Sequence, residues 1–283
     1  MHARLTRVIE HIDRHLDEPL DLERLGRLAS SSRYYFQRQF RAAFGLSPAR
    51  YVTLQRLRRA VLEVALRPWI PITDIAFGSG YGSPEAFARA FKRELGQSPS
   101  AFRVAPDWAR WAARQQPLRH LEETLMTTPS ADDVRIVDFP ETRVAALEHI
   151  GTEAALMTSI RRFVAWRRGH GLPPTKSRTF NVFHADSAGP QHIHYDLCAT
   201  IDGPLEPNEE GIVEKTLPGG RCAVIRIQGS DAGIAPAFAY LYDIWLAEQG
   251  EEARDAPPFA ERVAFYPEVS AADAITDLFV PLR

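Results

Sequence analysis

Two short segments of this 283-residue chain place hydrogen-bonding side chains opposite a stripe of phenylalanines. At about 100° per residue, the polar face comprises Tyr34, Gln37, Arg38 and Arg41 in the first segment and Glu85, Arg89 and Lys92 in the second. Arginine and glutamine can hydrogen-bond to purine edges in the major groove, and arginine and lysine can contact phosphates. The pattern is typical of helices that read nucleic acid, although a polar helix face can also be simply solvated.

The two segments are copies of one motif, Phe36–Pro48 and Phe87–Pro99, fifty-one positions apart. In each copy an apolar residue recurs every four positions, a glycine ends the helix and Ser-Pro begins the next one. Glycine is favoured just after a helix and proline at its first position. The sequence therefore predicts two helices of one type.

Each copy follows a short predicted helix, 22–29 or 72–79, that ends in small residues. Helix, tight turn and helix form the DNA-binding motif whose second helix enters the major groove. The glycine-rich stretch 78–83 has a second interpretation as a phosphate-binding loop. It follows a helix rather than a strand and has no lysine to complete it, so we interpret it as the turn of the second motif.

The pattern Ile72-x-x-Ile75-Ala76-x-x-x-Gly80-Tyr81, followed by Phe87-x-Arg89-x-Phe91-Lys92-x-x-x-Gly96-x-Ser98-Pro99-x-x-x-Arg103, resembles the AraC/XylS family of transcription regulators over residues 1–106. The resemblance implies that bases are read by Tyr34, Gln37 and Arg38 in the first copy and by Glu85 and Arg89 in the second. Arg41, Ser83 and Lys92 are further candidate DNA contacts. The second copy departs from the pattern at Ser83-Pro84, since proline fits only the first turn of a helix.

The segment Pro48–Leu66 is predicted to form a helix of 19 residues between the two motifs. At 1.5 Å per residue such a helix is about 28 Å long. It would hold the two recognition helices about one DNA turn, near 34 Å, apart, so that one chain can address two successive major grooves. Arg50, Arg56, Arg58 and Arg59 on or near this helix are either phosphate contacts or solvated surface, and the sequence leaves both open.

Charge is distributed unevenly along the chain. Residues 1–128 carry 20 Lys and Arg against 13 Asp and Glu, whereas the rest carries 14 against 23. The first part can face phosphates and the second cannot, which indicates two different roles. No run of 18 apolar residues and no secretory leader is present, so we expect a cytoplasmic protein without membrane contact. Cys198 and Cys222 lack CxxC spacing and are expected to be buried thiols.

Composition and periodicity change near residue 130. We expect an all-α double helix-turn-helix domain in residues 1–106, a broken helical connector with a hinge at 127–130 in residues 107–132, and an α+β domain in residues 133–283. In the last domain a strand-helix-strand-strand pattern occurs twice, which predicts an antiparallel sheet built from two repeats. The predicted strands are 134–137, 144–147, 179–184, 192–201, 220–226, 260–266 and 274–282, the helices are 156–169 and 235–249, and a long loop leads to 220.

This second half resembles the GyrI-like small-molecule-binding domain in Leu217–Val224, in Leu241-x-x-x-Trp245-Leu246 and in Thr276–Leu282. The resemblance implies a groove between the repeats that holds an effector against aromatic side chains and a buried glutamate. The matching positions are Trp245 and Glu261, and further candidate ligand-binding residues are Tyr195, Tyr240 and Phe163. Aromatic walls and a desolvated carboxylate favour an apolar or cationic effector.

These observations predict a transcription regulator that binds double-stranded DNA and a small-molecule effector and needs no cofactor. RNA polymerase is a further candidate partner, and the sequence leaves monomer and homodimer open. The alternative is a hydrolase or drug-sequestering protein that acts on reactive small molecules, with Glu261 and a tyrosine (Tyr195, Tyr240 or Tyr266) activating water. His184, His192 and His194 could surround a metal, but alternating strand histidines are usually surface residues, so we predict no metal site.

Overall fold

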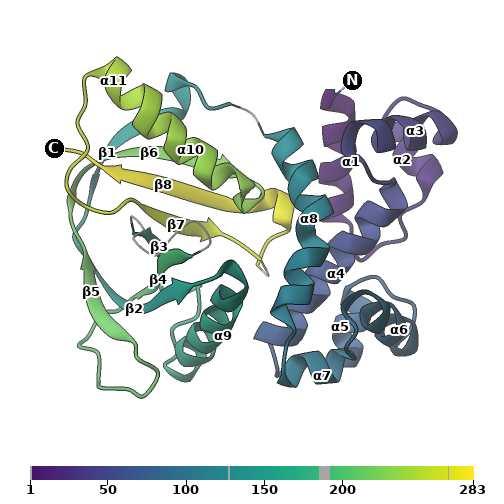
Figure 1. Cartoon of the computed structure of the whole chain (residues 1–283), viewed down its shortest axis with the longest axis horizontal. Helices are drawn as coiled ribbons and strands as arrows, with labels where there is room; N and C mark the ends of the chain where they lie inside the picture. The colour runs from purple at the N-terminus through teal and green to yellow at the C-terminus, as the bar shows by residue number, and fades with distance from the viewer. Residues whose placement is uncertain (1, 127, 185–191, 267) are drawn as a thin grey trace. The chain divides into compact units, whose positions relative to one another are not determined.

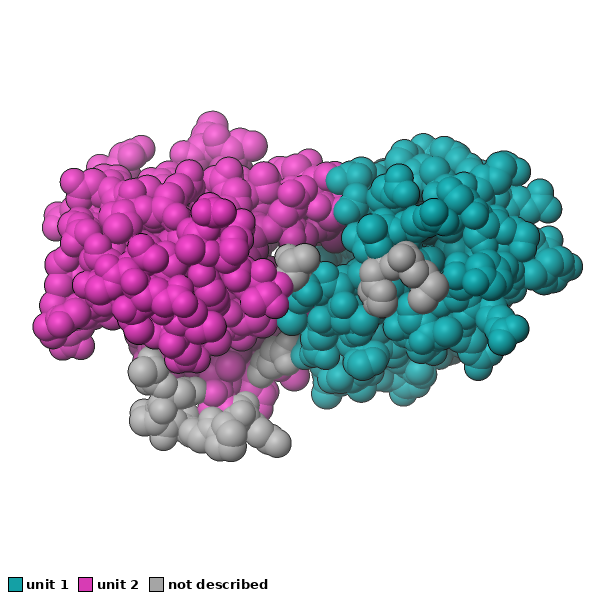
Figure 2. Space-filling view, turned by 90° about the horizontal axis from the view of Figure 1, so that it is seen from above, with its two compact units in different colours: residues 1–126 teal, residues 127–283 magenta. Residues whose placement is uncertain are grey.

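The computed structural model describes residues 2–126, 128–184, 192–266 and 268–283. The chain divides into two compact units, residues 1–126 and residues 127–283, which are coloured separately in Figure 2. The first unit is helical, whereas the second is built on a curled antiparallel sheet with helices (Figure 1). This is the predicted fold class.

The helices of the first unit begin and end at the predicted signals. Serine side chains cap α3, α4, α6 and α7, and proline occupies the first turn of α4, α6 and α7. Gly45 and Gly96 end α3 and α6 with φ of +73°. The helices are α1 (His2–Arg14), α2 (Leu22–Leu28), α3 (Arg33–Phe44), α4 (Pro48–Leu66), α5 (Ile72–Gly78), α6 (Pro84–Leu95), α7 (Pro99–Val104) and α8 (Trp108–Leu125).

The turns inside the two helix-turn-helix motifs share one backbone conformation. The residue with positive φ is Ser30 (φ +52°) in the first copy and Gly80 (φ +74°) in the second. Their amides donate to Arg27 O and Phe77 O, both at 2.9 Å. The second turn contains one more residue before its recognition helix, because α5 begins 50 positions after α2 whereas α6 begins 51 positions after α3.

The helix α8 differs from the predicted broken connector, since it runs unbroken through Pro117 and belongs to the first unit. Its Leu118 and Leu121 are buried in the core formed by α1, α2, α3 and the start of α4. At its beginning Trp108 packs edge-to-face on Phe102 of the second copy. These contacts stabilise the helix despite the hydrogen bond that proline removes. Thr127, part of the predicted hinge, lies outside the described residues.

In the second unit the predicted strands and helices are present, with one addition. The long loop before residue 220 contains an additional strand, β5. It lies at the edge of the sheet, and most of its side chains are exposed. The elements are β1 (Val134–Phe139), β2 (Thr142–Gly151), α9 (Glu153–Gly169), β3 (Thr179–Phe183), β4 (Ile193–Thr200), β5 (Val213–Leu217), β6 (Gly220–Gln228), α10 (Ile234–Tyr240), the π-helical turn η3 (Leu241–Trp245), α11 (Leu246–Gln249), β7 (Phe259–Ala264) and β8 (Ile275–Pro281).

The sheet order β1-β6-β8-β7-β3-β4-β2-β5 reflects the internal duplication. The repeats β2-α9-β3-β4 and β6-α10-β7-β8 meet where β3 pairs with β7 at the centre. The strand that precedes each repeat is exchanged, since β1 pairs with β6 and β5 pairs with β2. All strand pairs are antiparallel.

The two faces of the sheet bury different residues. On one face α9 packs on β2 and β4, and α10 packs on β6 and β8, which leaves β3 and β7 between the helices (Figure 1). We call this the helix face. The opposite face carries a cluster of four phenylalanine rings, Phe139, Phe180, Phe259 and Phe279, whose centroids lie 4.7–6.2 Å from their neighbours. Rings from strands β1 and β3 meet there because the sheet is curled.

Candidate nucleic-acid interface and ligand-binding residues

The recognition helix α3 presents the predicted polar face to solvent. Its phenylalanines Phe36, Phe40 and Phe44 are buried. Opposite them Tyr34 is 75% exposed and Arg38 and Arg41 are exposed, while Gln37 is half-buried. Tyr35, which the periodicity did not single out, is 57% exposed in the first helical turn beside Tyr34. Its position at the start of the helix was the available signal, because first-turn side chains of a recognition helix reach the bases.

The recognition helix α6 presents a different set. Glu85, Arg89 and Lys92 are exposed. Ser83 is the N-cap, and its Oγ accepts a hydrogen bond from Ala86 N at 3.2 Å, so Pro84 lies in the first turn. Hydrogen bonds from its own backbone amide and from the Ser83 hydroxyl, followed by the charge of Arg89, lower the pKa of Glu85. This helix therefore presents a carboxylate as well as two cations.

Three of the four arginines of α4 bond to other segments of the first unit, and the fourth pairs within the helix. Arg50 donates to both carboxylate oxygens of Glu94 on α6 at 2.9 Å. Arg58 pairs with Glu122 on α8 at 2.5 Å, and Arg59 with Glu63 one turn along α4. Arg56 donates to backbone carbonyls after α1. The acceptors of Arg50, Arg56 and Arg58 lie 38 to 64 residues away in the sequence, so the side-chain types alone did not reveal them.

A half-buried carboxyl group, Asp13 of α1, lies beside the first copy. Asp13 accepts hydrogen bonds from the Tyr51 hydroxyl at 2.8 Å and from Gln55 Nε2 at 3.1 Å. Burial raises the pKa of Asp13 to about 7, an effect that the Tyr51 hydrogen bond opposes. Burial also raises the pKa of Tyr51, so that this hydroxyl remains a donor.

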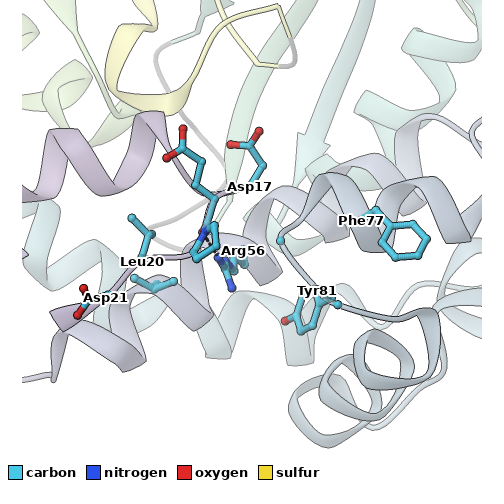
Figure 3. A pocket seen from close by; sticks show the side chains of 11 residues that line it. Asp17, Leu20, Asp21, Arg56, Phe77 and Tyr81 are labelled. Atoms are coloured by element: carbon cyan, nitrogen blue, oxygen red, sulfur yellow. Dashed lines mark hydrogen bonds between the residues drawn. The ribbon is translucent and has the colours of Figure 1, made fainter. Parts of the chain in front are cut away.

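A cavity of about 490 Å³ lies between the two copies (Figure 3). Its walls come from residues 17–21 after α1 and from residues 77–82 around the turn that follows α5. Arg56 and Val52 of α4 complete it. The cavity thus separates the segment that connects α1 to α2 from the turn of the second helix-turn-helix motif.

In the second unit four of the five predicted ligand-binding residues lie on the helix face. Trp245, 4% exposed, and Tyr240 belong to the cluster under α10, whereas Tyr195 and Phe163 belong to the cluster under α9. Phe183 of β3 packs against both clusters. Burial raises the pKa of Tyr195 to about 12, so its hydroxyl stays protonated.

Arg262 of β7 is a charged residue on the helix face, on the strip that β3 and β7 form between α9 and α10. Its Nε donates to Asn181 Oδ1 at 2.8 Å, and its Nη1 and Nη2 atoms pair with the Asp231 carboxylate. Arg262 is 16% exposed and Asp231 66%, so the carboxylate forms the outer part of the pair.

Glu261 does not lie with Trp245. Neighbouring residues of a strand point to opposite faces, and Ala260 belongs to the cluster that contains Trp245, whereas Phe259 belongs to the phenylalanine cluster. Glu261 accepts both guanidinium hydrogen bonds of Arg178, at 2.7 and 2.6 Å. The expectation of one groove that contains Trp245 and this glutamate is therefore corrected by the strand register.

Two of the three histidines considered for metal binding, His184 and His194, contact carboxylates. His184 Nε2 lies 3.0 Å from Asp196, and His194 Nε2 lies 2.8 Å from Glu148. Lys215 reaches Asp196 at 2.8 Å. Over the residues that the structure describes, no group of three or more His, Cys, Asp or Glu side chains could hold a metal ion.

Both cysteines, Cys198 and Cys222, are buried free thiols, as predicted, and burial raises the pKa of each. Within the described ranges, no helix combines the length and the apolar character that crossing a membrane requires.

Comparison with known proteins gives two family matches. A model described as the GyrI-like small molecule binding domain matches residues 132–283, and a model described as a helix-turn-helix domain matches residues 25–105. The probable transcriptional regulator YgiV of Escherichia coli (strain K12) is 34% identical over 153 residues, which cover 53% of this chain and 96% of that protein.

Two further relatives cover different shares of the chain. The regulatory protein SoxS of Salmonella typhimurium is 36% identical over 96 residues, 34% of this chain and 89% of that protein. The right origin-binding protein of Escherichia coli (strain K12) is 29% identical over 166 residues, 58% of this chain and 55% of that protein.

Proposed function

Since the chain belongs to the family of GyrI-like small molecule binding domains and joins such a domain to an AraC-type helix-turn-helix domain, we propose that this DNA-binding transcription regulator reads two successive major grooves and responds to an effector bound by residues 133–283. The observation that carries the DNA part is the pair of exposed polar faces on α3 and α6, each backed by buried phenylalanines. The helix between them has 19 residues, which is suited to one turn of DNA.

In this proposal the exposed faces carry the contacts that the resemblance implies. Tyr34, Gln37 and Arg38 read the first half-site and Glu85 and Arg89 the second. Arg41, Ser83 and Lys92 lie at the phosphates, with Ser83 acting through its backbone because its hydroxyl caps α6. A lysine or arginine on phosphate adds affinity without sequence preference.

The DNA proposal is tested with Arg38→Ala and Arg89→Ala in a selection of binding sites from random DNA. Each variant should lose about 1–3 kcal/mol on the wild-type site and lose preference in its own half-site only. Lys92→Ala is the matched control, because a lost phosphate contact should weaken all sequences alike and flatten the salt dependence. Unchanged site selection in both arginine variants would contradict the proposed reading faces.

We propose that α8 carries the effector signal, because it contacts both DNA-reading copies. Glu122 pairs with Arg58, and Arg114 Nε donates to Glu94 O at 3.0 Å at the end of α6. Leu118 and Leu121 lie in the core of the first copy. The chain enters the second unit directly after this helix, so a shift of α8 would alter both copies together.

For the effector we propose an apolar or aromatic body held on the helix face. Tyr195 and Phe163 on one side and Tyr240 and Trp245 on the other flank the strip that β3 and β7 form. Trp245 ends a π-helical turn, a helix irregularity that occurs often at functional sites. The cationic preference expected from Glu261 loses its basis, since Arg178 already neutralises that carboxylate.

The effector proposal is tested by thermal shift of the full chain with probes that share one aromatic body and carry a cationic, neutral or anionic head. Ligand-dependent stabilisation should fall in Trp245→Phe and Tyr240→Phe but not in Glu261→Gln, which lies on the opposite face. Loss of binding in Glu261→Gln alone would place the site on the phenylalanine-cluster face. Turnover of a probe would favour the hydrolase alternative.

A further inference from the structure

One contact joins the two helix-turn-helix copies at the middle of α4. Arg56 Nε donates to Leu16 O at 2.8 Å, and its Nη2 donates to Glu18 O at 2.7 Å. Both carbonyls belong to the segment that connects α1 to α2 in the first copy. The guanidinium is partly buried, so these hydrogen bonds are shielded from water.

The second copy reaches the same place from the other side through Gly80. A Cβ atom on Gly80 would lie 2.5 Å from Leu16 O and 2.7 Å from the Arg56 guanidinium, so only glycine allows this approach. Its φ of +74° also favours glycine. The turn between α5 and α6 therefore contacts the Arg56 guanidinium, which also binds the α1–α2 segment of the first copy.

The contact is local. Beside it lies the cavity of about 490 Å³ that separates residues 17–21 from residues 77–82, with Arg56 at the centre of the view in Figure 3. Tyr81 and Phe77 lie on one side of Arg56, and Leu20 and Asp21 lie on the other (Figure 3). The loops of the two copies thus meet at Leu16, Arg56 and Gly80 next to open space rather than through a packed interface.

We infer that Arg56 and Gly80 are positioning residues that set the separation of the two recognition helices, and thereby the number of base pairs that the protein accepts between its two half-sites. The inference rests on the proposal that α3 and α6 both read DNA. Each inserted base pair moves the second half-site about 3.4 Å along the duplex and about 35° around it. A pair of recognition helices held by this contact cannot follow that shift, whereas a pair joined by α4 and α8 without it could do so by bending.

The experiment measures binding to a series of sites that differ only in the spacer, from two base pairs shorter to two longer than the site selected by the wild type. The wild type should disfavour a change of one base pair about tenfold, and Arg56→Ala should reduce this preference to about threefold while keeping the bases selected in each half-site. Arg56→Lys, which retains one donor for Leu16 O, should restore part of the preference.

Glycine variants give a second, independent measurement. Gly80→Ala should shift or broaden the spacer optimum, because its Cβ pushes the two copies apart. Gly82→Ala is the matched control in the same turn, since a Cβ there has nothing within 4 Å, and it should keep the wild-type profile. Arg59→Ala removes a positive charge from the same helix and should weaken all spacers equally. Melting temperatures show which variants are folded.

The outcomes separate the inference from the proposed function. Unchanged spacer profiles in Arg56→Ala and in Gly80→Ala would overturn the positioning role and leave two-groove reading intact. Equal weakening at every spacer in these variants would mean a purely structural role and would overturn it as well. Insensitivity of the wild type to the spacer, with no loss in Arg89→Ala, would overturn both. Relaxed spacing in the two variants, with the Lys rescue, would support the inference.

Discussion

The two helix-turn-helix copies share their backbone and differ in what surrounds it. Both have the same turn hydrogen bonds, a serine cap and a stripe of buried apolar residues. They differ at the position with positive φ, which is Ser30 in the first copy and Gly80 in the second. They also differ on the reading face, where Tyr34 of the first copy corresponds to Glu85 of the second. Duplication thus preserved what the fold requires locally, whereas the contacts to neighbours and to DNA diverged.

The interiors of the copies differ as well. In the first copy the half-buried Asp13 and the buried Gln55 both bond to the Tyr51 hydroxyl. In the second copy a series of edge-to-face aromatic contacts runs from Phe91 through Phe102 to Trp108. The raised pKa of Asp13 makes stability depend on pH near neutrality, whereas hydrogen bonds from Arg50 lower the pKa of Glu94, the buried carboxyl of the second copy. The comparison therefore predicts that only the first copy responds to pH in this range.

The largest expected effect is on the pH dependence of unfolding. The folded-state pKa of Asp13 is raised from 3.8 to about 7, so the folded state keeps a proton that the unfolded chain releases. Its contribution to stability is complete below pH 3.8 and is lost as the pH rises to about 7. The free energy of unfolding should therefore be greater at pH 5.5 than at pH 7 by about 2 kcal/mol, measured by urea denaturation.

Asp13→Asn is the control for this prediction. The amide keeps the shape of the side chain and cannot titrate, so the difference between the two pH values should shrink by the same amount. A pH difference that persists in Asp13→Asn would place the titrating group elsewhere and break the contrast between the copies.

A smaller effect is expected at the turns. Ser30 holds φ of +52°, which costs a non-glycine residue about 1–2 kcal/mol, whereas its counterpart is Gly80. Ser30→Gly removes that strain but adds flexibility to the unfolded chain, so we expect a net stabilisation of about 0.5 kcal/mol. Thermal unfolding should show a slightly higher Tm, and Ser31→Gly, without positive φ, should lower it. A lower Tm in Ser30→Gly would mean that the serine side chain compensates for the strain.

Local signals in the sequence predicted most of the fold. The nineteen-residue helix Pro48–Leu66 was predicted to the residue, because Ser-Pro begins it and periodicity runs through it. Strand β5 was missed since Val213–Leu217 is a short, mostly exposed edge strand with little apolar alternation. The unbroken α8 was missed because Pro117 is a local breaker that tertiary packing overrides.

The sequence predicted those residues of the candidate site whose exposure depends on one helix alone. It did not predict the residues that depend on contacts between distant segments. Arg38 and Arg89 point outward as their spacing requires. The role of Arg56 depends on backbone carbonyls 40 and 38 residues away, and side-chain identity does not encode such partners. Glu261 was placed with Trp245 by resemblance, but a shift of one residue along a strand changes the face.

By itself the sequence determined the doubled motif, the class of each unit and the outward faces of the recognition helices, because periodicity, caps and charge are local properties of the chain. Only the tertiary structure decided which arginines are bound within the protein, which face of the sheet receives Glu261, and how closely Gly80 approaches Arg56. Those outcomes depend on distances between segments far apart in the sequence, and they follow from packing rather than from any local preference.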